Sequence, residues 1–220
     1  MNKPAVNFSR SSRMLLAELV VVFLGVYGAF WVDDIRDERD RAERTVQVVL
    51  ALQQDLADYV EVSGGFATYM ENGLQDWNDA AARGEMPVPF VFRIFGAEKP
   101  PISTWEVVRQ SELAELLNTN LLYELGFFYN ELDGYGDRYV RYAVFTESEV
   151  LPLMKVGNSS FYTADGKKLL PRFAAHMDRL REFLHFSVET VVWAECLRNR
   201  LETANVTGTT CRTDVGITPM

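Results

Sequence analysis

The chain contains two cysteines, Cys196 and Cys211, which could bind a metal, carry redox chemistry or form a disulfide. Neither belongs to a CxxC or CxxCH unit, the spacings typical of metal and redox sites. The fourteen residues between them include Gly208 and several threonines, so the chain can fold back to bonding distance. We predict a disulfide between Cys196 and Cys211, as expected in an oxidising compartment. The alternative is two unrelated thiols.

Metal-ligating and catalytic patterns are otherwise missing from the sequence. His176 and His185 are nine residues apart, which does not place them on one helical face at ligand spacing. There is no glycine-rich phosphate loop, no nucleophile elbow and no HExxH sequence. We therefore expect a protein that is not an enzyme and has no cofactor or metal.

Five large side chains follow one another at alternating steps of four and three residues and form a stripe along a predicted helix. It consists of Phe128, Leu132, Tyr135, Tyr139 and Tyr142. This heptad-like spacing is typical of the core of a helical bundle, and we interpret the stripe in that way. The alternative is that the tyrosine rings stack on a ligand.

Glu18 is the only formally charged residue in the apolar segment 14–32. A carboxylate inside a membrane segment is costly and marks a functional site by default. Gly25, Gly28 and Ala29 share its helical face, and small side chains let another helix approach closely. We interpret this face as a contact with a partner helix. The alternative is an interfacial carboxylate without a special role, stabilised by the helix dipole.

The same segment has the length of a membrane span. Its nineteen residues extend about 28 Å as a helix at about 1.5 Å per residue, close to the hydrocarbon thickness of a bilayer. Tyr27, Phe30 and Trp31 lie at its end, where aromatic rings favour the interface, and ten of the next twelve residues are charged. We predict a transmembrane helix. A cleaved export signal is the alternative, although the run is long for one.

Beyond this segment the chain is predicted to be mainly α, with the transmembrane helix continuing into an extracytoplasmic bundle of long antiparallel helices. Apolar residues recur at helical spacing, and prolines, glycines and asparagines separate the segments. The predicted helices cover residues 33–62, 66–83 (the weakest), 103–117, 121–151 and 171–204. Residues 84–101 contain a short apolar run that we expect to be a loop or an edge strand, and a loop is expected at 155–168.

These elements divide the chain into four segments. We expect a cytoplasmic tail (1–13), the transmembrane helix (14–32), a helical extracytoplasmic domain (33–204) and a C-terminal tail (205–220). The net charge of −9 is uneven, because residues 1–32 carry +2 and the remainder therefore carries −11. Such an acidic domain repels phosphate, so we expect no nucleic-acid partner.

The sequence gives only weak signals for which side of the membrane each end of the chain occupies. Basic residues flank both ends of the apolar segment, so the Lys/Arg count does not choose a side. Two cysteines outside any metal or redox motif favour an oxidising compartment. We expect a protein of the bacterial inner membrane, with its N-terminus in the cytoplasm and its C-terminal domain in the periplasm.

Two stretches resemble a family of small bacterial single-pass membrane-anchored proteins of unknown function. The first is the order Glu18, Gly25 and Trp31 followed by an Arg/Glu-rich run that ends in LALQQDL. The second is STWEVVRQSELAELLNTNLLYELGFFYNEL, residues 103–132. Together they cover about a third of the chain, and Glu112 replaces a glycine frequent in the family. The resemblance implies an anchored, mostly helical extracytoplasmic domain and no activity.

Two functions are compatible with these features. The first is a non-catalytic structural or accessory subunit that packs, in the bilayer, against the transmembrane subunits of a larger bacterial complex, for which an energy-transducing assembly is a candidate. The second is an extracytoplasmic sensor or ligand-binding module, in which the tyrosine stripe and the apolar loop 88–95 line a pocket. The missing catalytic motifs and the small-residue face with Glu18 favour the first.

Overall fold

A computed structural model describes residues 10–91, 99, 102–110, 112–203, 210–214 and 216. The side chains of residues 10–16 and 214 are not described, so the first three side chains of the predicted span 14–32 lie outside the described residues. So does most of the predicted tail 1–13, and only residues 210–214 and 216 of the predicted tail 205–220 are described.

The chain is mainly α-helical, as predicted. The helices are α1 (Arg10–Ala82), α2 (Ser103–Gln110), α3 (Thr119–Phe145), α4 (Leu151–Met154), α5 (Pro171–Thr203) and α6 (Cys211–Asp214). In the described part of the chain there is no strand, and Tyr162 and Leu169 form only an isolated bridge. The edge strand considered for residues 84–101 is absent from residues 85–91, and residues 92–98 lie outside the described part.

The chain divides into two compact units, Met1–Gln47 and Val48–Met220, and α1 contributes to both. In the first unit, every described side chain from residue 17 to residue 47 is exposed except that of Thr45. The apolar side chains between Leu19 and Val32 belong to this exposed set. None of the helices, as far as the chain is described, combines the length and apolar character needed to cross a membrane.

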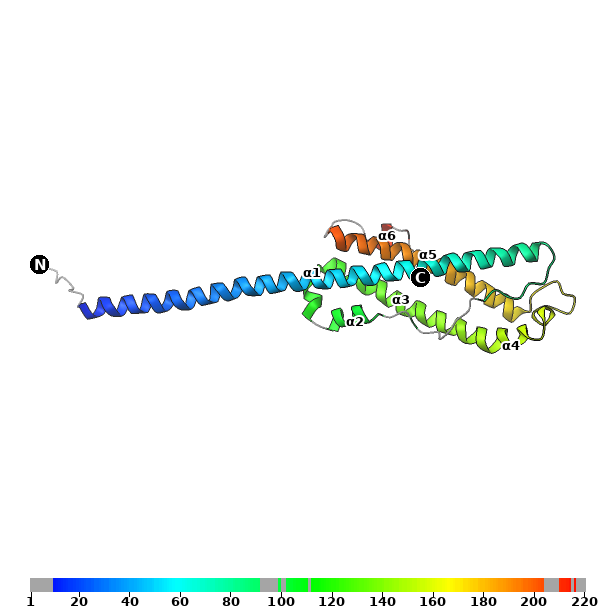
Figure 1. The fold of residues 1–220 in the computed structure, drawn as a ribbon, viewed down its shortest axis with the longest axis horizontal. Coiled ribbons are helices and arrows are strands. Elements are labelled where there is room, and N and C mark those ends of the chain that lie inside the picture. Colours follow the sequence, from blue (N-terminus) through cyan, green and yellow to red (C-terminus); the bar gives the residue numbers. More distant parts are fainter. Residues whose placement is uncertain are drawn as a thin grey trace, which may run out of the picture. The chain divides into compact units, whose positions relative to one another are not determined.

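The second unit is a helical bundle built from the C-terminal part of α1 together with α3 and α5 (Figure 1). Residues later in α1 contact residues later in α3: Asp55 contacts Tyr129, and Phe66 contacts Tyr139. These two helices therefore run parallel, which departs from the antiparallel arrangement that we predicted. The long connection between α1 and α3 makes this direction possible.

Helix α5 runs antiparallel to α3, as predicted. Phe128 contacts Trp193 near the start of α3, whereas Phe145 contacts Phe173 near its end. Four members of the predicted stripe are buried in this core, and Tyr139 is half-buried. The interpretation of the stripe as bundle core is thus confirmed.

Helix α1 is longer than predicted at its C-terminal end. The sequence indicates a helix that ends near residue 62 and a weaker one from residue 66, because Gly64 and Gly65 disfavour helix. The structure has one continuous helix through both glycines. Leu56 before them and Met70 after them are fully buried, so packing of one apolar face outweighs the cost of two glycines.

The other helix boundaries follow local signals. The Asn118 side chain accepts a hydrogen bond from the Asn120 N–H (2.9 Å) and caps α3, at the break predicted from the sequence. Pro171 begins α5, also as predicted. The predicted continuation of α3 to Leu151 is only partly correct, because a π-helical turn, Thr146–Val150, separates α3 from α4.

Candidate functional site

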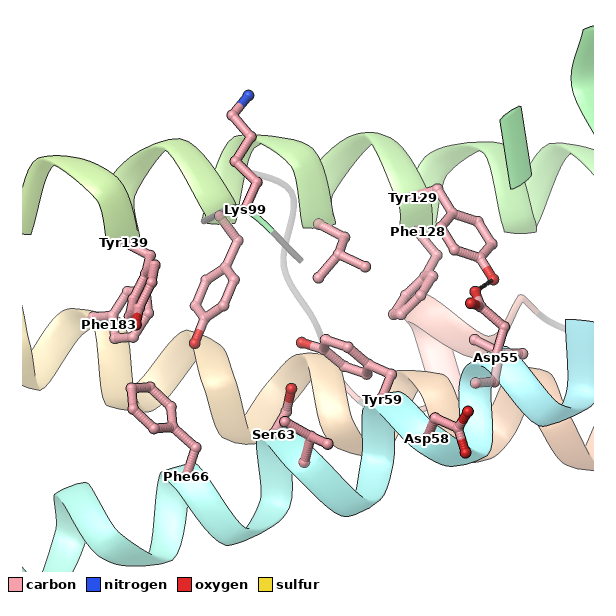
Figure 2. A pocket seen from close by; sticks show the side chains of 14 residues that line it. Asp55, Asp58, Tyr59, Ser63, Phe66, Lys99, Phe128, Tyr129, Tyr139 and Phe183 are labelled. Atoms are coloured by element: carbon pink, nitrogen blue, oxygen red, sulfur yellow. Dashed lines mark hydrogen bonds between the residues drawn. The ribbon is translucent and has the colours of Figure 1, made fainter. Parts of the chain in front are cut away.

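A cavity of about 490 Å³ that opens to solvent lies between α1, α3 and α5 (Figure 2). Its walls come from residues far apart in the sequence. They are Asp55, Leu56, Asp58, Tyr59, Val62, Ser63 and Phe66 of α1, Phe128, Tyr129, Leu132, Tyr135 and Tyr139 of α3, Phe183 of α5, and Lys99. Four of the five residues of the predicted tyrosine stripe therefore face a common space.

One end of the cavity is a cluster of aromatic rings. Tyr135 stacks on Phe183 with ring centroids 4.3 Å apart and planes 7° from parallel. Tyr139 lies against the same phenylalanine at 6.0 Å, and Phe66 meets both rings edge to face. Figure 2 shows the rings of Phe66, Tyr139 and Phe183 gathered at this end. This end offers flat apolar surfaces to a ligand.

The opposite end carries a carboxylate held by two hydroxyl groups. Tyr129 donates to Asp55 Oδ2 (2.5 Å) and Thr104 donates to Asp55 Oδ1 (3.3 Å). The Trp105 ring stacks on Tyr129 at 5.3 Å and fixes its orientation. Burial, and then the nearby negative charge of Asp55, raise the pKa of the Tyr129 phenol far above its ordinary value.

The hydroxyl groups between the two ends have partners within the bundle. Tyr59 donates to Thr190 Oγ1 (2.8 Å), and the Tyr135 and Ser187 hydroxyls share a hydrogen bond of 2.5 Å. Burial is the largest cause of the raised pKa values of both tyrosines. The phenols are therefore neutral at physiological pH, and they act as hydrogen-bonding groups rather than as bases.

Lys99 contributes its aliphatic stem to the wall rather than its charge. Its ammonium nitrogen pairs with Asp133 (3.0 Å) and Asp137 (2.7 Å), and Figure 2 shows it directed away from the cavity. Hydrogen bonds to these two carboxylates raise the pKa of the Lys99 ammonium. The cavity therefore has an aromatic end and a carboxylate end, and the one cation among its described lining residues, Lys99, is directed away from it.

The predicted disulfide is present. Cys196 of α5 is bonded to Cys211 of α6, with 5.8 Å between their Cα atoms. The Cys211 N–H also donates to Glu124 Oε2 (3.0 Å), so the bond lies where α3, α5 and α6 meet. In the described residues, no group of three or more His, Cys, Asp or Glu side chains could hold a metal ion.

The predicted helix-packing face lies in the first unit, away from this chemistry in the sequence. Glu18 and Ala29 are exposed, and a Cβ atom added at Gly25 or Gly28 would meet nothing within 4 Å. The predicted interface anchors, Tyr27, Phe30 and Trp31, are exposed as well. A role for either set in packing or anchoring stays a prediction.

Sequence reasoning missed the contributions of α1 and α5 to the cavity. Tyr59 and Phe66 are seven residues apart and therefore share a helical face, which is a signal that could have paired them with the stripe. Asp55 had no such signal, because its partner Tyr129 is 74 residues away. Residues 88–91 of the apolar loop are not among the lining residues, although the loop was expected to line a pocket.

Comparison with protein-family models, with curated proteins and with solved structures returned no match for this chain. The resemblance carried by Glu18, Gly25, Trp31 and residues 103–132 therefore stays a prediction.

Proposed function

We propose that the protein is a non-catalytic accessory subunit of a larger bacterial inner-membrane complex. Residues 14–32 would form a transmembrane helix, and the helical domain would lie in the periplasm. A membrane anchor would account for the apolar N-terminal part of α1. A partner helix in the bilayer would account for the face formed by Glu18, Gly25, Gly28 and Ala29.

The main support for a membrane anchor is the exposure of the apolar residues in the N-terminal part of α1. The large hydrophobic side chains from Leu19 to Val32 are each between 47% and 70% exposed. A continuous apolar surface of this kind is rare on a protein that is surrounded by water, because hydration of apolar area is unfavourable. A bilayer, together with a neighbouring transmembrane helix, would cover it.

The partner is supported by the open face of the same segment. Gly25 and Gly28 have nothing within 4 Å of their Cβ positions, so a second helix could approach the backbone there. Glu18 lies on the same helical face and would supply a polar contact to that helix.

Purification in a mild detergent, followed by identification of co-purifying chains, tests the proposal. We expect wild-type protein to bring down defined transmembrane subunits, and Gly25→Leu and Gly28→Leu to lose them because the close approach is blocked. Phe23→Leu, on the opposite face of the helix, is the matched control and should keep them. The wild type and the three variants should all stay in the membrane fraction after alkaline washing. A wild-type protein that purifies alone would contradict the accessory role.

A second function is favoured by the cavity between α1, α3 and α5: an extracytoplasmic sensor or ligand-binding module. The cavity's volume of about 490 Å³ and its aromatic end suit a small apolar or aromatic molecule.

Mass spectrometry of a solvent extract from purified protein would reveal such a molecule. Ser63→Phe fills the cavity and should abolish its retention, whereas Thr68→Phe, exposed on the same helix and not part of the lining, should not.

A further inference from the structure

A second cavity, of about 570 Å³, lies between α3 and α5 and shares only Phe183 with the first. Its lining combines aromatic side chains with cationic ones. Three arginines and one glutamate, Glu182, are the charged residues in the lining, so the local charge is +2 with a neutral histidine, whereas the whole chain carries −9. The two cavities therefore suit different ligands.

The histidine of this cavity, His176, is held between two aromatic rings. It is only 2% exposed, and it stacks on Tyr142 (centroids 4.5 Å apart) and on Phe145 (4.9 Å apart). Its Nε2 atom has no hydrogen-bond partner among the described residues. Leaving a buried polar atom without a partner is unfavourable, so a ligand that supplies one would be stabilised.

Guanidinium groups from both helices line the cavity together with this imidazole. Arg138 and Arg141 are one helical turn apart on α3, and Arg179 comes from α5. The Arg138 guanidinium lies 5.3 Å from the centre of the Phe186 ring, which orients it along the cavity wall. An oxyanion placed among these guanidinium groups would accept charge-assisted hydrogen bonds from them.

The protonation state of His176 is consistent with such a site. Burial, and then the positive charge of Arg179, lower the pKa of the imidazole to about 4. At physiological pH the ring is neutral and has one N–H donor. Because the ring lines the cavity, an anion bound beside it would change its electrostatic environment.

We propose that the cavity between α3 and α5 binds a small organic anion, whose carboxylate or phosphate group contacts Arg138, Arg141 and Arg179 while its apolar body lies against Phe145 and Phe186. Arginine suits this role because its planar guanidinium makes paired hydrogen bonds to both kinds of oxyanion. The site is independent of the accessory role and of the first cavity.

Titration calorimetry of the full chain in an uncharged detergent tests the site, with phenyl phosphate as the probe. We expect saturable binding, weaker binding of inorganic phosphate, and none of phenol, which has the ring without the charge. Arg141→Gln and Arg179→Gln should each weaken binding roughly tenfold, since each removes a charge-assisted contact. Both arginines are exposed, so these variants should fold, as their circular dichroism would verify.

Arg181→Gln is the matched control, because Arg181 is on α5 but pairs with Asp178 (2.8 Å) and does not line the cavity. It should bind phenyl phosphate as the wild type does. A second measurement follows the His176 ring nitrogens by ¹⁵N NMR, which should shift on saturation with phenyl phosphate. Equal weakening in all three variants, equal affinity for inorganic phosphate, or an unshifted His176 signal would each overturn the proposal.

Discussion

Glu124 is a carboxylate that the bundle nearly buries, and both of its oxygens are in use. Oε1 accepts from Arg200 (2.6 Å) and Oε2 from the Cys211 N–H (3.0 Å), while the two side chains of the ion pair are only 10% and 15% exposed. Removing one partner of such a pair leaves a charge with little water around it. We predict that Glu124→Ala lowers the free energy of unfolding by about 3 kcal/mol, measured by urea denaturation.

The control for this prediction is an exposed pair on the same bundle. Arg172 and Glu149 are 3.2 Å apart with both side chains open to solvent. Because water screens such a pair, Glu149→Ala should cost less than about 1 kcal/mol. Similar losses in the two variants would show that the burial of Glu124 does not matter.

His176 gives the protein a pH-dependent stability. The folded chain holds the pKa of His176 at about 4, whereas an imidazole in the unfolded chain titrates near its ordinary value of about 6.5. The unfolded state therefore takes up this proton first, and stability falls as the pH falls from about 6.5 to about 4. Arg138, Arg141, Arg179 and Glu182 line the same cavity, and the positive charge of Arg179 opposes protonation of the imidazole.

We predict that the urea midpoint of the wild type declines across this pH range more steeply than that of His176→Gln, whose side chain does not titrate. Parallel profiles for wild type and His176→Gln would contradict the assignment.

At the level of single residues, the sequence predicted what depends on local spacing and missed what depends on distant partners. The pairing of Cys196 with Cys211 follows from a short, flexible connection. Glu124 looks like any polar residue on an amphipathic helix, because its partner Arg200 is 76 residues away. His176 was weighed only as a metal ligand, since nothing near it in the sequence indicates two stacking rings from α3.

The segment that follows α1 is attached to the bundle through Phe90, whose ring lies directly over Gly73 of α1. A Cβ atom at Gly73 would come within 1.9 Å of Phe90 Cε2. Tyr142 of α3 also donates to the Phe90 carbonyl (3.3 Å), which holds the Phe90 backbone in place, so only a change of the ring's rotamer could relieve the clash. Overpacking costs about 1–3 kcal/mol and alanine regains about 1 kcal/mol of helix propensity. We predict that Gly73→Ala lowers stability by up to about 2 kcal/mol in urea denaturation.

The same helix provides the matched substitution. Gly65 has nothing within 4 Å of its Cβ position, so Gly65→Ala should raise stability by about 1 kcal/mol through helix propensity alone. In a double-mutant cycle, Phe90→Ala should cost less in the Gly73→Ala background than in the wild type. A stabilising Gly73→Ala would refute the close packing of Phe90.

Helix boundaries were predictable wherever a cap or a proline sets them, as at Asn118 and Pro171. They were not predictable where packing overrides a local preference. The continuation of α1 through Gly64 and Gly65 depends on contacts of its apolar face with helices more than 50 residues away in the sequence. The parallel course of α1 and α3 has the same origin, because no local pattern encodes the direction of a neighbouring helix.

For the molecule as a whole, the sequence predicted a mainly helical chain with a long core-forming segment, and that prediction is confirmed. Helical periodicity is strong in residues 119–145 and 171–203, and both became long helices of the bundle. A pocket beside the tyrosine stripe was considered from the sequence, but the walls that α1 and α5 contribute to it were not predicted, and neither was the cavity around His176. Both depend on how distant helices pack. The membrane anchor and the periplasmic location stay predictions, and they lead to one joint test.

The joint test links topology to the disulfide between Cys196 and Cys211. If the domain is periplasmic, alkaline phosphatase fused to the C-terminus should be active in a bacterial host, and mass mapping without reductant should find the two cysteines bonded in protein from native membranes. Cys211→Ser should then lower the free energy of unfolding by about 3 kcal/mol on the chain-entropy model, because it opens a loop with a sequence separation of 15 residues. Two thiols that alkylate freely, together with an inactive fusion, would place the domain in a reducing compartment and reverse the orientation.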